Sequence, residues 1–239
     1  MNILVTGGAS GLGAAIVHKA ATEKGDTVYF TYASSQAAAN ELMAQYPNVK
    51  GLPCNFTDAA SVDAFAAQVA GLDLDVLVNN AYVGINKDHF HKMEQQVFTD
   101  SFAHNVLPTL RITPEALKTF RKKKSGRIIN IITSYVLNKP PIGLSEYVAN
   151  KAYLLSMNRS WANENSRFNV VSNAISPAFM ETKLTRYTDE RLIEQMKDEH
   201  PMKRLLTTEE VADTVHAYFS ISRHINGTHL VINAGSDMV

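Results

Sequence analysis

A tyrosine and a lysine stand four residues apart in the stretch SEYVANKAYL, residues 145–154. The stretch is typical of the opening turns of a helix. Residues at positions i and i+4 share one helix face, so Tyr147 and Lys151 would point the same way, with their polar tips within reach of one ligand. A half-exposed amphipathic helix would also accommodate this pair, and its meaning depends on the elements around it.

Those elements alternate along the chain. β-rich runs are NILVT, TVYFTY, a weaker one at 49–53, DVLVN, GRIINIIT, NVVSNAIS and GTHLVIN, and helical patterns fall at about 12–24, 35–46, 58–70, the stretch holding Tyr147, and 207–220. Seven strands separated by helices predict right-handed crossovers and a parallel sheet with helices on both faces. We therefore expect an α/β fold, a single-domain, doubly wound, Rossmann-like seven-stranded sheet spanning residues 1–239.

Composition narrows the classes of partner. The chain has 239 residues, 45% of them hydrophobic, and its 23 Lys and Arg balance its 23 Asp and Glu. A formal charge of zero gives no electrostatic reason to expect nucleic acid or an anionic membrane. The single Cys54 cannot form an intrachain disulfide, and no apolar run approaches the length of a membrane span or signal peptide. A cytoplasmic protein with a small-molecule partner is expected.

The end of the first strand carries a glycine-rich turn, TGGASGLG, with Gly7, Gly11 and Gly13. Ligands of doubly wound folds bind beyond the carboxyl ends of the strands. Glycines there let backbone N–H groups approach a phosphate, and the following helix N-terminus favours its negative charge. The spacing G-x-x-x-G-x-G is neither the common G-x-G-x-x-G fingerprint nor a P-loop. It predicts a dinucleotide site, with mere tight packing as the alternative.

The order and spacing of several short motifs resemble the short-chain dehydrogenase/reductase family over nearly the whole chain. The motifs are TGGASGLG, LVNNAY, HNVLPTL, IITSY with YVANK, SPAFMET and NGTHLVINAGS. The resemblance implies an NAD(P)(H)-dependent enzyme that interconverts a ketone and a secondary alcohol by hydride transfer.

The resemblance also implies a catalytic tetrad of Asn105, Ser134, Tyr147 and Lys151. Tyr147 would protonate the developing alkoxide, Ser134 would hydrogen-bond the substrate oxygen, Lys151 would hold the nicotinamide ribose, and Asn105 would help hold a water that relays protons to Lys151. A phenol with a pKa of about 10 is poorly matched to acid–base work at neutral pH. A nearby Lys151 ammonium is therefore expected to lower the pKa of Tyr147 by about 3 units.

The same resemblance implies the cofactor contacts. They are Gly7, Ser10, Gly11, Leu12, Gly13, Tyr32, Ser34, Asn55, Phe56, Asn80, Ala81, Tyr147, Lys151, Pro177 and Thr182. At the end of the second strand Tyr32 stands where an Asp would repel a 2′-phosphate, and Ser34 could donate to one, so NADP(H) is expected in preference to NAD(H).

Four positions depart from the family pattern. Tyr82 replaces the glycine of NNAG and could reshape the pocket where nicotinamide and substrate meet. Asn55 replaces the usual Asp near adenine, where an amide still forms hydrogen bonds. Ala178 and Ala234 stand where glycines are common.

Within the family, VYFTYASS, KKKSGRIINI and the C-terminal ending most resemble the 3-oxoacyl-carrier-protein reductases. The expected substrate is therefore a 3-oxoacyl thioester on a carrier protein. The alternatives are a free sugar, polyketide or steroid-like alcohol, and a cofactor-sensing protein without turnover. Segment 180–205 falls where the family has a substrate lid, and the family suggests a homotetramer or homodimer.

Two charged groups of residues remain. His89 and His91 lack further ligands nearby for a metal, so a solvated loop and no metal are expected. The basic run Arg121 to Lys124, with Arg127 and Arg167, is either a solvated surface or, for a carrier-linked substrate, a docking surface beside the pocket mouth.

Overall fold

One parallel sheet forms the centre of the computed structural model, which describes residues 1–23, 25–137, 139–182, 184–185 and 188–236. The strands are β1 (Asn2–Val5), β2 (Thr27–Tyr32), β3 (Val49–Pro53), β4 (Val76–Asn79), β5 (Gly126–Ile131), β6 (Val170–Pro177) and β7 (His229–Ile232). The α-helices are α1 (Gly11–Ala21), α2 (Gln36–Gln45), α3 (Ala59–Val69), α4 (Gln95–Asn105), α5 (Leu107–Lys123), α6 (Ser145–Asn165), α7 (Glu190–Glu199) and α8 (Thr208–Ala217). The 3₁₀ turns are η1 (Ala70–Leu72), η2 (Phe90–Lys92), η3 (Ser134–Val136) and η4 (Ser166–Phe168).

The strand order is β3-β2-β1-β4-β5-β6-β7, and every neighbouring pair is parallel. The chain builds outward from β1 to β3, then returns to place β4 on the other side of β1. This reversal makes the carboxyl ends of β1 and β4 the topological switch point, where doubly wound sheets bind ligands. The predicted fold class is confirmed.

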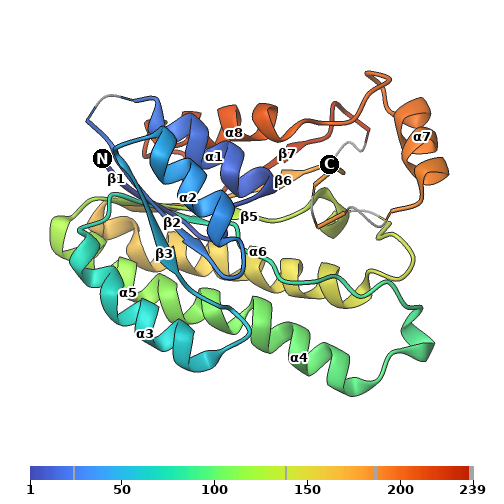
Figure 1. Ribbon diagram of the computed structural model, residues 1–239, viewed down its shortest axis with the longest axis horizontal. Helices are drawn as coiled ribbons and strands as arrows, with labels where there is room; N and C mark the ends of the chain where they lie inside the picture. Colours follow the sequence, from blue (N-terminus) through green and yellow to red (C-terminus); the bar gives the residue numbers. More distant parts are fainter. Residues whose placement is uncertain (24, 138, 183, 186–187, 237–239) are drawn as a thin grey trace.

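Helices cover both faces of the sheet in Figure 1, with α1, α2 and α8 on one face and α3, α4, α5 and α6 on the other. Each face has its own apolar core, one around α1, α2 and α8 and the other around α3, α5 and α6. Ile3, Leu4 and Val5 of β1 are 0% exposed. A strand buried on both faces gives a continuous apolar run rather than an alternating one, as the sequence indicated.

The stretch after β4 forms two helices, although its mixture of polar and apolar residues predicted no clear element. α4 and α5 meet at Val106, and Pro108 stands in the first turn of α5, where a missing N–H costs no helical hydrogen bond. Both helices pack on α3 or α6. They form the wall against which α6, the helix of Tyr147 and Lys151, is held.

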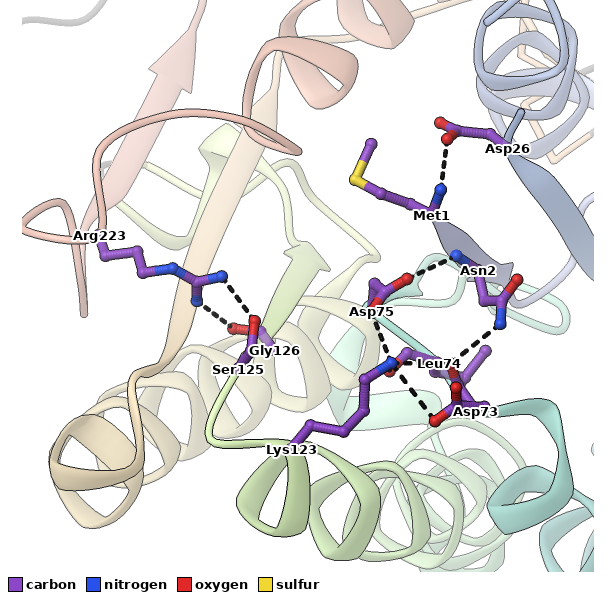
Figure 2. A network of polar contacts seen from close by, with 10 residues as sticks. All are labelled: Met1, Asn2, Asp26, Asp73, Leu74, Asp75, Lys123, Ser125, Gly126 and Arg223. Atoms are coloured by element: carbon purple, nitrogen blue, oxygen red, sulfur yellow. Dashed lines mark hydrogen bonds and ion pairs between the residues drawn. The ribbon is translucent and has the colours of Figure 1, made fainter. Parts of the chain in front are cut away.

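The amino edge of the sheet is joined by charged contacts, which Figure 2 shows. The Lys123 ammonium donates to the carbonyls of Asp73 and Leu74 and to the Asp75 carboxylate, 2.7 Å away. Asp75 also accepts from the backbone N–H of Asn2 at 2.8 Å. These contacts join the starts of β1 and β4 to the end of α5, at the edge opposite the switch point.

Within the described part of the chain, no helix has the combined length and apolarity required to cross a bilayer.

Candidate active site

Two adjoining cavities open at the switch point. The deep cavity, about 380 Å³, is lined by Tyr147 and Lys151 as well as the glycine-rich turn. The outer cavity, about 970 Å³, is lined by Ser34, Ser35 and Asn55. The two share lining residues from the ends of β1, β2 and β4, and volumes of this size suit a small molecule or cofactor.

Three positions of the turn between β1 and α1 require glycine. Gly7 and Gly11 have φ values of 68° and 53°, and a Cβ on Gly13 would lie 2.1 Å from the carbonyl oxygen of Gly7. Ser10 precedes α1 without a side-chain cap, and the first turn of α1 has no acidic residue. Because Gly11, Leu12 and Gly13 line the deep cavity, this helix N-terminus can hold a phosphate there.

The end of β4 is fixed to β1 through Thr6. The Thr6 hydroxyl accepts from the backbone N–H groups of Asn80, at 2.9 Å, and Ala81, at 3.0 Å. The Asn80 side-chain amide donates to the Thr6 carbonyl at 2.9 Å. These bonds set the start of the loop that carries Tyr82 into both cavities.

All fifteen of the expected cofactor contacts line one cavity or the other. Those in the deep cavity are Gly7, Ser10, Gly11, Leu12, Gly13, Tyr32, Phe56, Asn80, Ala81, Tyr147, Lys151, Pro177 and Thr182, and Ser34 and Asn55 line the outer one. The tight glycine turn and the open N-terminus of α1 therefore fit the pyrophosphate of a dinucleotide.

Tyr147 and Lys151 lie on one face of α6, but their protonation differs from the expectation. Burial raises the pKa of Tyr147, and a hydrogen bond with Thr133 only partly offsets it. Burial lowers the pKa of Lys151 to about 7. Its ammonium donates to the Ile131 carbonyl at 2.7 Å and lies 6.0 Å from the centre of the Tyr147 ring. The predicted lowering of the Tyr147 pKa is wrong for this structure, because desolvation acts on both groups.

The hydroxyl beside Tyr147 belongs to Thr133 rather than Ser134. Thr133 lines the deep cavity, shares a hydrogen bond with Tyr147, and accepts from the Tyr135 N–H at 3.4 Å. Ser134 is 7% exposed, begins η3 and is not among the residues that line either cavity. The family resemblance implied Ser134, yet of the two neighbouring residues only Thr133 lines the cavity.

Asn105 also lies outside the cavities. It is 1% exposed at the end of α4, and its side-chain amide accepts from the Val83 N–H at 2.6 Å and donates to the Val83 carbonyl at 3.1 Å. A further bond runs to the Ser101 carbonyl at 3.0 Å. Asn105 thus holds the loop after β4 against α4, and its water-mediated link to Lys151 stays a prediction.

Apolar side chains make up a large part of the lining of the deep cavity. They come from the loop after β4, the segment after β5, the stretch after the end of β6 and the predicted lid: Val83, Ile85, Pro141, Ile142, Leu144, Phe179, Met180, Leu184, Leu192 and Met196. Leu192 and Met196 belong to α7, which stands at one end of the molecule in Figure 1. Residues 183, 186 and 187 of the predicted lid lie outside the described residues.

Sequence reasoning missed Thr133 and Lys87. Lys87 lines both cavities and donates to the Thr188 hydroxyl at 3.3 Å. Nothing in the local sequence around Lys87 distinguishes it from a solvated loop residue. No signal in the sequence separated Thr133 from Ser134, because which of the two side chains enters the cavity depends on where β5 ends.

Ala234, a departure from the family pattern, adopts a φ of 53°. Only glycine takes this left-handed conformation without steric cost, so the substitution is strained. Ala178 lines the deep cavity beside Pro177.

The basic residues are grouped, but away from the cavities. The guanidinium groups of Arg121 and Arg167 lie 4.2 Å and 4.8 Å from the centre of the Phe168 ring, and Lys124 directly precedes β5. They mark the amino edge of the sheet, whereas Tyr147 lies at the other end of α6, a 21-residue helix about 30 Å long. The prediction that these basic residues form a docking surface beside the pocket mouth is therefore wrong within one chain. Arg127, a further member of the predicted surface, is buried, at 8% exposure.

The described residues include no group of three or more His, Cys, Asp or Glu arranged to hold a metal ion.

Comparison with known proteins gives consistent matches over nearly the full length. The family model described as enoyl-(acyl carrier protein) reductase matches residues 7–237. The 3-oxoacyl-(acyl-carrier-protein) reductase FabG of Aquifex aeolicus (strain VF5) is 32% identical over 97% of this chain and 95% of its own length. The enzyme of the same name from Vibrio harveyi is 33% identical over 99% of this chain and 97% of its own.

Two solved structures share the fold. A short chain dehydrogenase/reductase family protein matches with a TM-score of 0.84 and 29% identity, covering 98% of this chain and 96% of its own. A single-residue variant of the actinorhodin polyketide ketoreductase with NADPH matches with a TM-score of 0.87 and 22% identity, covering 98% and 96%, respectively. The latter likeness concerns the fold alone.

Proposed function

Because the chain belongs to the short-chain dehydrogenase/reductase family, we propose that it reduces the ketone of a 3-oxoacyl thioester to a secondary alcohol with a nicotinamide cofactor. The observation that supports this best is the meeting of Tyr147, Thr133 and Lys151 in a cavity that also contains the glycine-rich turn. A proton donor and a phosphate-binding turn in one cavity suit cofactor-dependent ketone reduction.

The residues that would hold the cofactor come from three strand ends. The N-terminus of α1 and the turn from Gly7 to Gly13 would bind the pyrophosphate, Asn55 and Phe56 the adenine, and Lys151 the nicotinamide ribose. When bound, the nicotinamide supplies a hydride to the carbonyl carbon of the substrate.

Tyr147 would supply the proton. Since burial raises its pKa, the phenol is neutral at physiological pH and can donate its proton to the substrate oxygen as negative charge develops there. The Thr133 hydroxyl would donate a hydrogen bond to the same oxygen, a role suited to a group fixed at the end of β5. Lys151, buried beneath this pair, would orient the ribose and then return a proton to Tyr147.

The lining of the cavities supports NADP(H) over NAD(H). No Asp or Glu is present among the described residues that line them, whereas Ser34, Ser35 and Lys87 are. A 2′-phosphate would thus meet donors and a cation instead of a repelling carboxylate. We expect kcat/KM to be higher with NADPH than with NADH, and a clear advantage for NADH would contradict this assignment.

The apolar lining of the deep cavity favours an acyl chain over a sugar. The carrier-protein form of the substrate is proposed from the names of the relatives, since the basic residues lie at the other edge of the sheet. A free polyketide or steroid-like ketone is the second candidate, because the same apolar residues would accept it. From the family we also propose a homodimer or homotetramer in the cytoplasm.

A substrate panel tests this proposal. Oxidation of NADPH would be followed by absorbance with one 3-oxoacyl group presented on an acyl carrier protein, as a small N-acetylcysteamine thioester, and as free cyclic or sugar ketones. We expect the thioesters to have the highest kcat/KM and the carrier-linked form to be preferred. Turnover only with free ketones would favour the second candidate, and cofactor binding without turnover on any of them would favour a sensing protein.

A further inference from the structure

Tyr82, at the position where the family pattern has a glycine, lies directly against both residues of the proposed proton-transfer pair. Its ring meets the ring of Tyr147 edge to face, with centroids 4.9 Å apart and planes at 78°. The Lys151 ammonium lies 4.9 Å from the centre of the Tyr82 ring, nearer than it lies to Tyr147. One aromatic ring therefore touches the proton donor and faces the cation.

The hydroxyl of Tyr82 is anchored on the opposite side, between α4 and α6. It donates to a Glu146 carboxylate oxygen at 3.3 Å and accepts from the Asn150 amide at 3.3 Å. Glu146 is 2% exposed and also accepts from the Ser101 hydroxyl and from the Asn86 N–H at 3.1 Å. Asn150 in turn donates to Ser101 at 2.9 Å. The Glu146 side chain is therefore held in one position. If a donor were lost, a buried carboxyl oxygen would have no hydrogen-bond partner to replace it.

Glu146 and Asn150 are neighbours of Tyr147 and Lys151 on α6, one residue earlier in each case. Because each pair is spaced i, i+4, Tyr147 and Lys151 lie on one face of α6, and Glu146 and Asn150 lie on an adjacent face. The Tyr82 side chain connects these two faces, with its ring on the first and its hydroxyl on the second.

On these contacts we propose that Tyr82 is a positioning residue, whose ring, held by Glu146 and Asn150, fixes the side chains of Tyr147 and Lys151 for proton transfer. The inference rests on the proposed ketone reduction. The family pattern has a glycine at position 82 and so assigns no role to a side chain there. The proposal also explains why a carboxyl group, that of Glu146, is buried beside the site.

Two physical effects follow from the ring. An edge-to-face contact restricts the rotation of the Tyr147 side chain, and misplacement of a reacting group by about 1 Å can cost roughly 100-fold in rate. The face of the ring also attracts the Lys151 ammonium, which has lost most of its contact with water. Without the ring, Lys151 would lose this contact and keep its bond to the Ile131 carbonyl, so the position of its ammonium would be less restricted.

Matched variants separate the ring from its hydroxyl. Tyr82→Leu removes the ring, whereas Tyr82→Phe retains it and removes only the hydroxyl. We expect Tyr82→Leu to lower kcat about 10- to 100-fold with little change in KM for the ketone, and Tyr82→Phe to stay within about fivefold of wild type. A Tyr82→Leu protein that keeps kcat within about twofold, even with a lower Tm, would show that Tyr82 is only core packing and would overturn the proposal.

A double-mutant cycle tests the anchor. Glu146→Ala leaves the ring in place but frees the Tyr82 hydroxyl, so its effect on kcat should largely overlap with that of Tyr82→Phe. The double variant should be no slower than the slower single variant. Fully additive losses would show that Glu146 acts independently of Tyr82 and would overturn this part of the proposal.

Crystal structures of the cofactor-free Tyr82→Leu and Tyr82→Phe proteins give a readout that does not depend on turnover. The tips of Tyr147 or Lys151 should move by about 1 Å or more, or adopt a second rotamer, only when the ring is absent. Unmoved tips in the Tyr82→Leu protein would overturn the proposal. Wild-type protein that reduces no ketone would reject the proposed function instead, and the crystal structures would still test the positioning.

Discussion

Lys151 is buried and Tyr147 is partly buried, and desolvation shifts both pKa values so that the uncharged forms are favoured. The pKa of Lys151 falls to about 7, while that of Tyr147 rises above its ordinary value. Near neutral pH the phenol therefore retains its proton and the amine is close to its titration point. A neutral phenol suits the direction of ketone reduction, in which we propose that Tyr147 gives up a proton.

Replacement of Lys151 should make the protein more stable at neutral pH. The folded pKa of Lys151, about 7, lies below its ordinary 10.5, so the folded state opposes protonation. The resulting loss of folding free energy is greatest below pH 7, where Lys151 is protonated in both states. It disappears as pH rises toward 10.5, where the unfolded chain also loses the proton. Lys151→Met should raise Tm by at least about 3 °C at about pH 6.5 and by less at about pH 9.5.

Differential scanning fluorimetry of Lys151→Met beside wild type at the two pH values measures this, with the exposed Lys92→Met as the control. A lower Tm of the Lys151 variant at the acidic value, or a gain that increases with pH, would contradict the assigned burial cost. The same variant should lose both turnover and cofactor affinity, since the stabilised protein lacks the proposed contact between Lys151 and the ribose.

Thr133, not Ser134, should be needed for turnover. Thr133→Val removes the hydroxyl that lines the deep cavity and should lower kcat about 100-fold, whereas Thr133→Ser should stay within about tenfold of wild type. Ser134→Ala should have an effect of less than about threefold, because Ser134 does not line the cavity. Steady-state kinetics with one thioester gives the ranking, and a larger loss for Ser134→Ala would restore the original prediction.

At the scale of elements, β-rich runs in the sequence predicted every strand of the described sheet. The central strands β1 and β4 give continuous apolar runs because they are buried, whereas the edge strand β3 gave a weaker one. The close backbone approach in the turn after β1 was also predicted, from its glycines. The choice between Thr133 and Ser134 was beyond this reasoning. It depends on where β5 ends and η3 begins, a difference of one residue that reverses which side chain enters the cavity.

The contacts of Tyr82 were unpredictable for a different reason. Its ring packs on Tyr147, and its hydroxyl bonds to Glu146, 64 positions later, at an interface between α4 and α6 that forms only in the folded chain. Likewise α4 and α5 have mixed polar and apolar patterns, because their stability comes from packing on α3 and α6 rather than from periodicity alone.

The close approach of α1 to β1 gives a prediction for Gly13. An added Cβ would lie 2.1 Å from the Gly7 carbonyl oxygen and 2.7 Å from the Asn80 amide, so the turn must shift. Gly13→Ala should weaken NADPH binding more than about tenfold and lower Tm, as a residue strained against backbone does. The matched control is Gly71→Ala, where nothing lies within 4 Å. Equal cofactor affinities for the two variants, by calorimetric titration, would contradict a close phosphate-binding turn.

At the scale of the whole molecule, the two edges of the sheet have different roles. The carboxyl edge holds the cavities, and the amino edge joins the starts of β1 and β4 to α5 through the contacts of Asp75 and Lys123 in Figure 2. Long helices separate the two edges, so stability and catalysis should respond independently to changes at each edge.

Asp75→Ala tests that separation. Despite partial burial, which raises it, the pKa of Asp75 is lowered overall by its bonds to Lys123 and Asn2. Its stabilisation is therefore present at neutral pH and is lost as pH falls through its folded pKa. The variant should lower Tm by about 3–8 °C at neutral pH, by less near about pH 3, and leave kcat/KM within about twofold. A large loss of kcat/KM at temperatures where the variant is folded would contradict the separation of the edges.

The measurement that tests the central claim most directly is the rate of NADPH oxidation by wild type and Tyr147→Phe with one 3-oxoacyl thioester. Cofactor affinity, measured by titration in the same buffer, serves as the control. We predict that kcat falls at least about 100-fold while the Kd for NADPH changes little, because the variant loses the proton donor and keeps the ring. A Tyr147→Phe protein that retains more than about a tenth of the wild-type kcat would contradict the account.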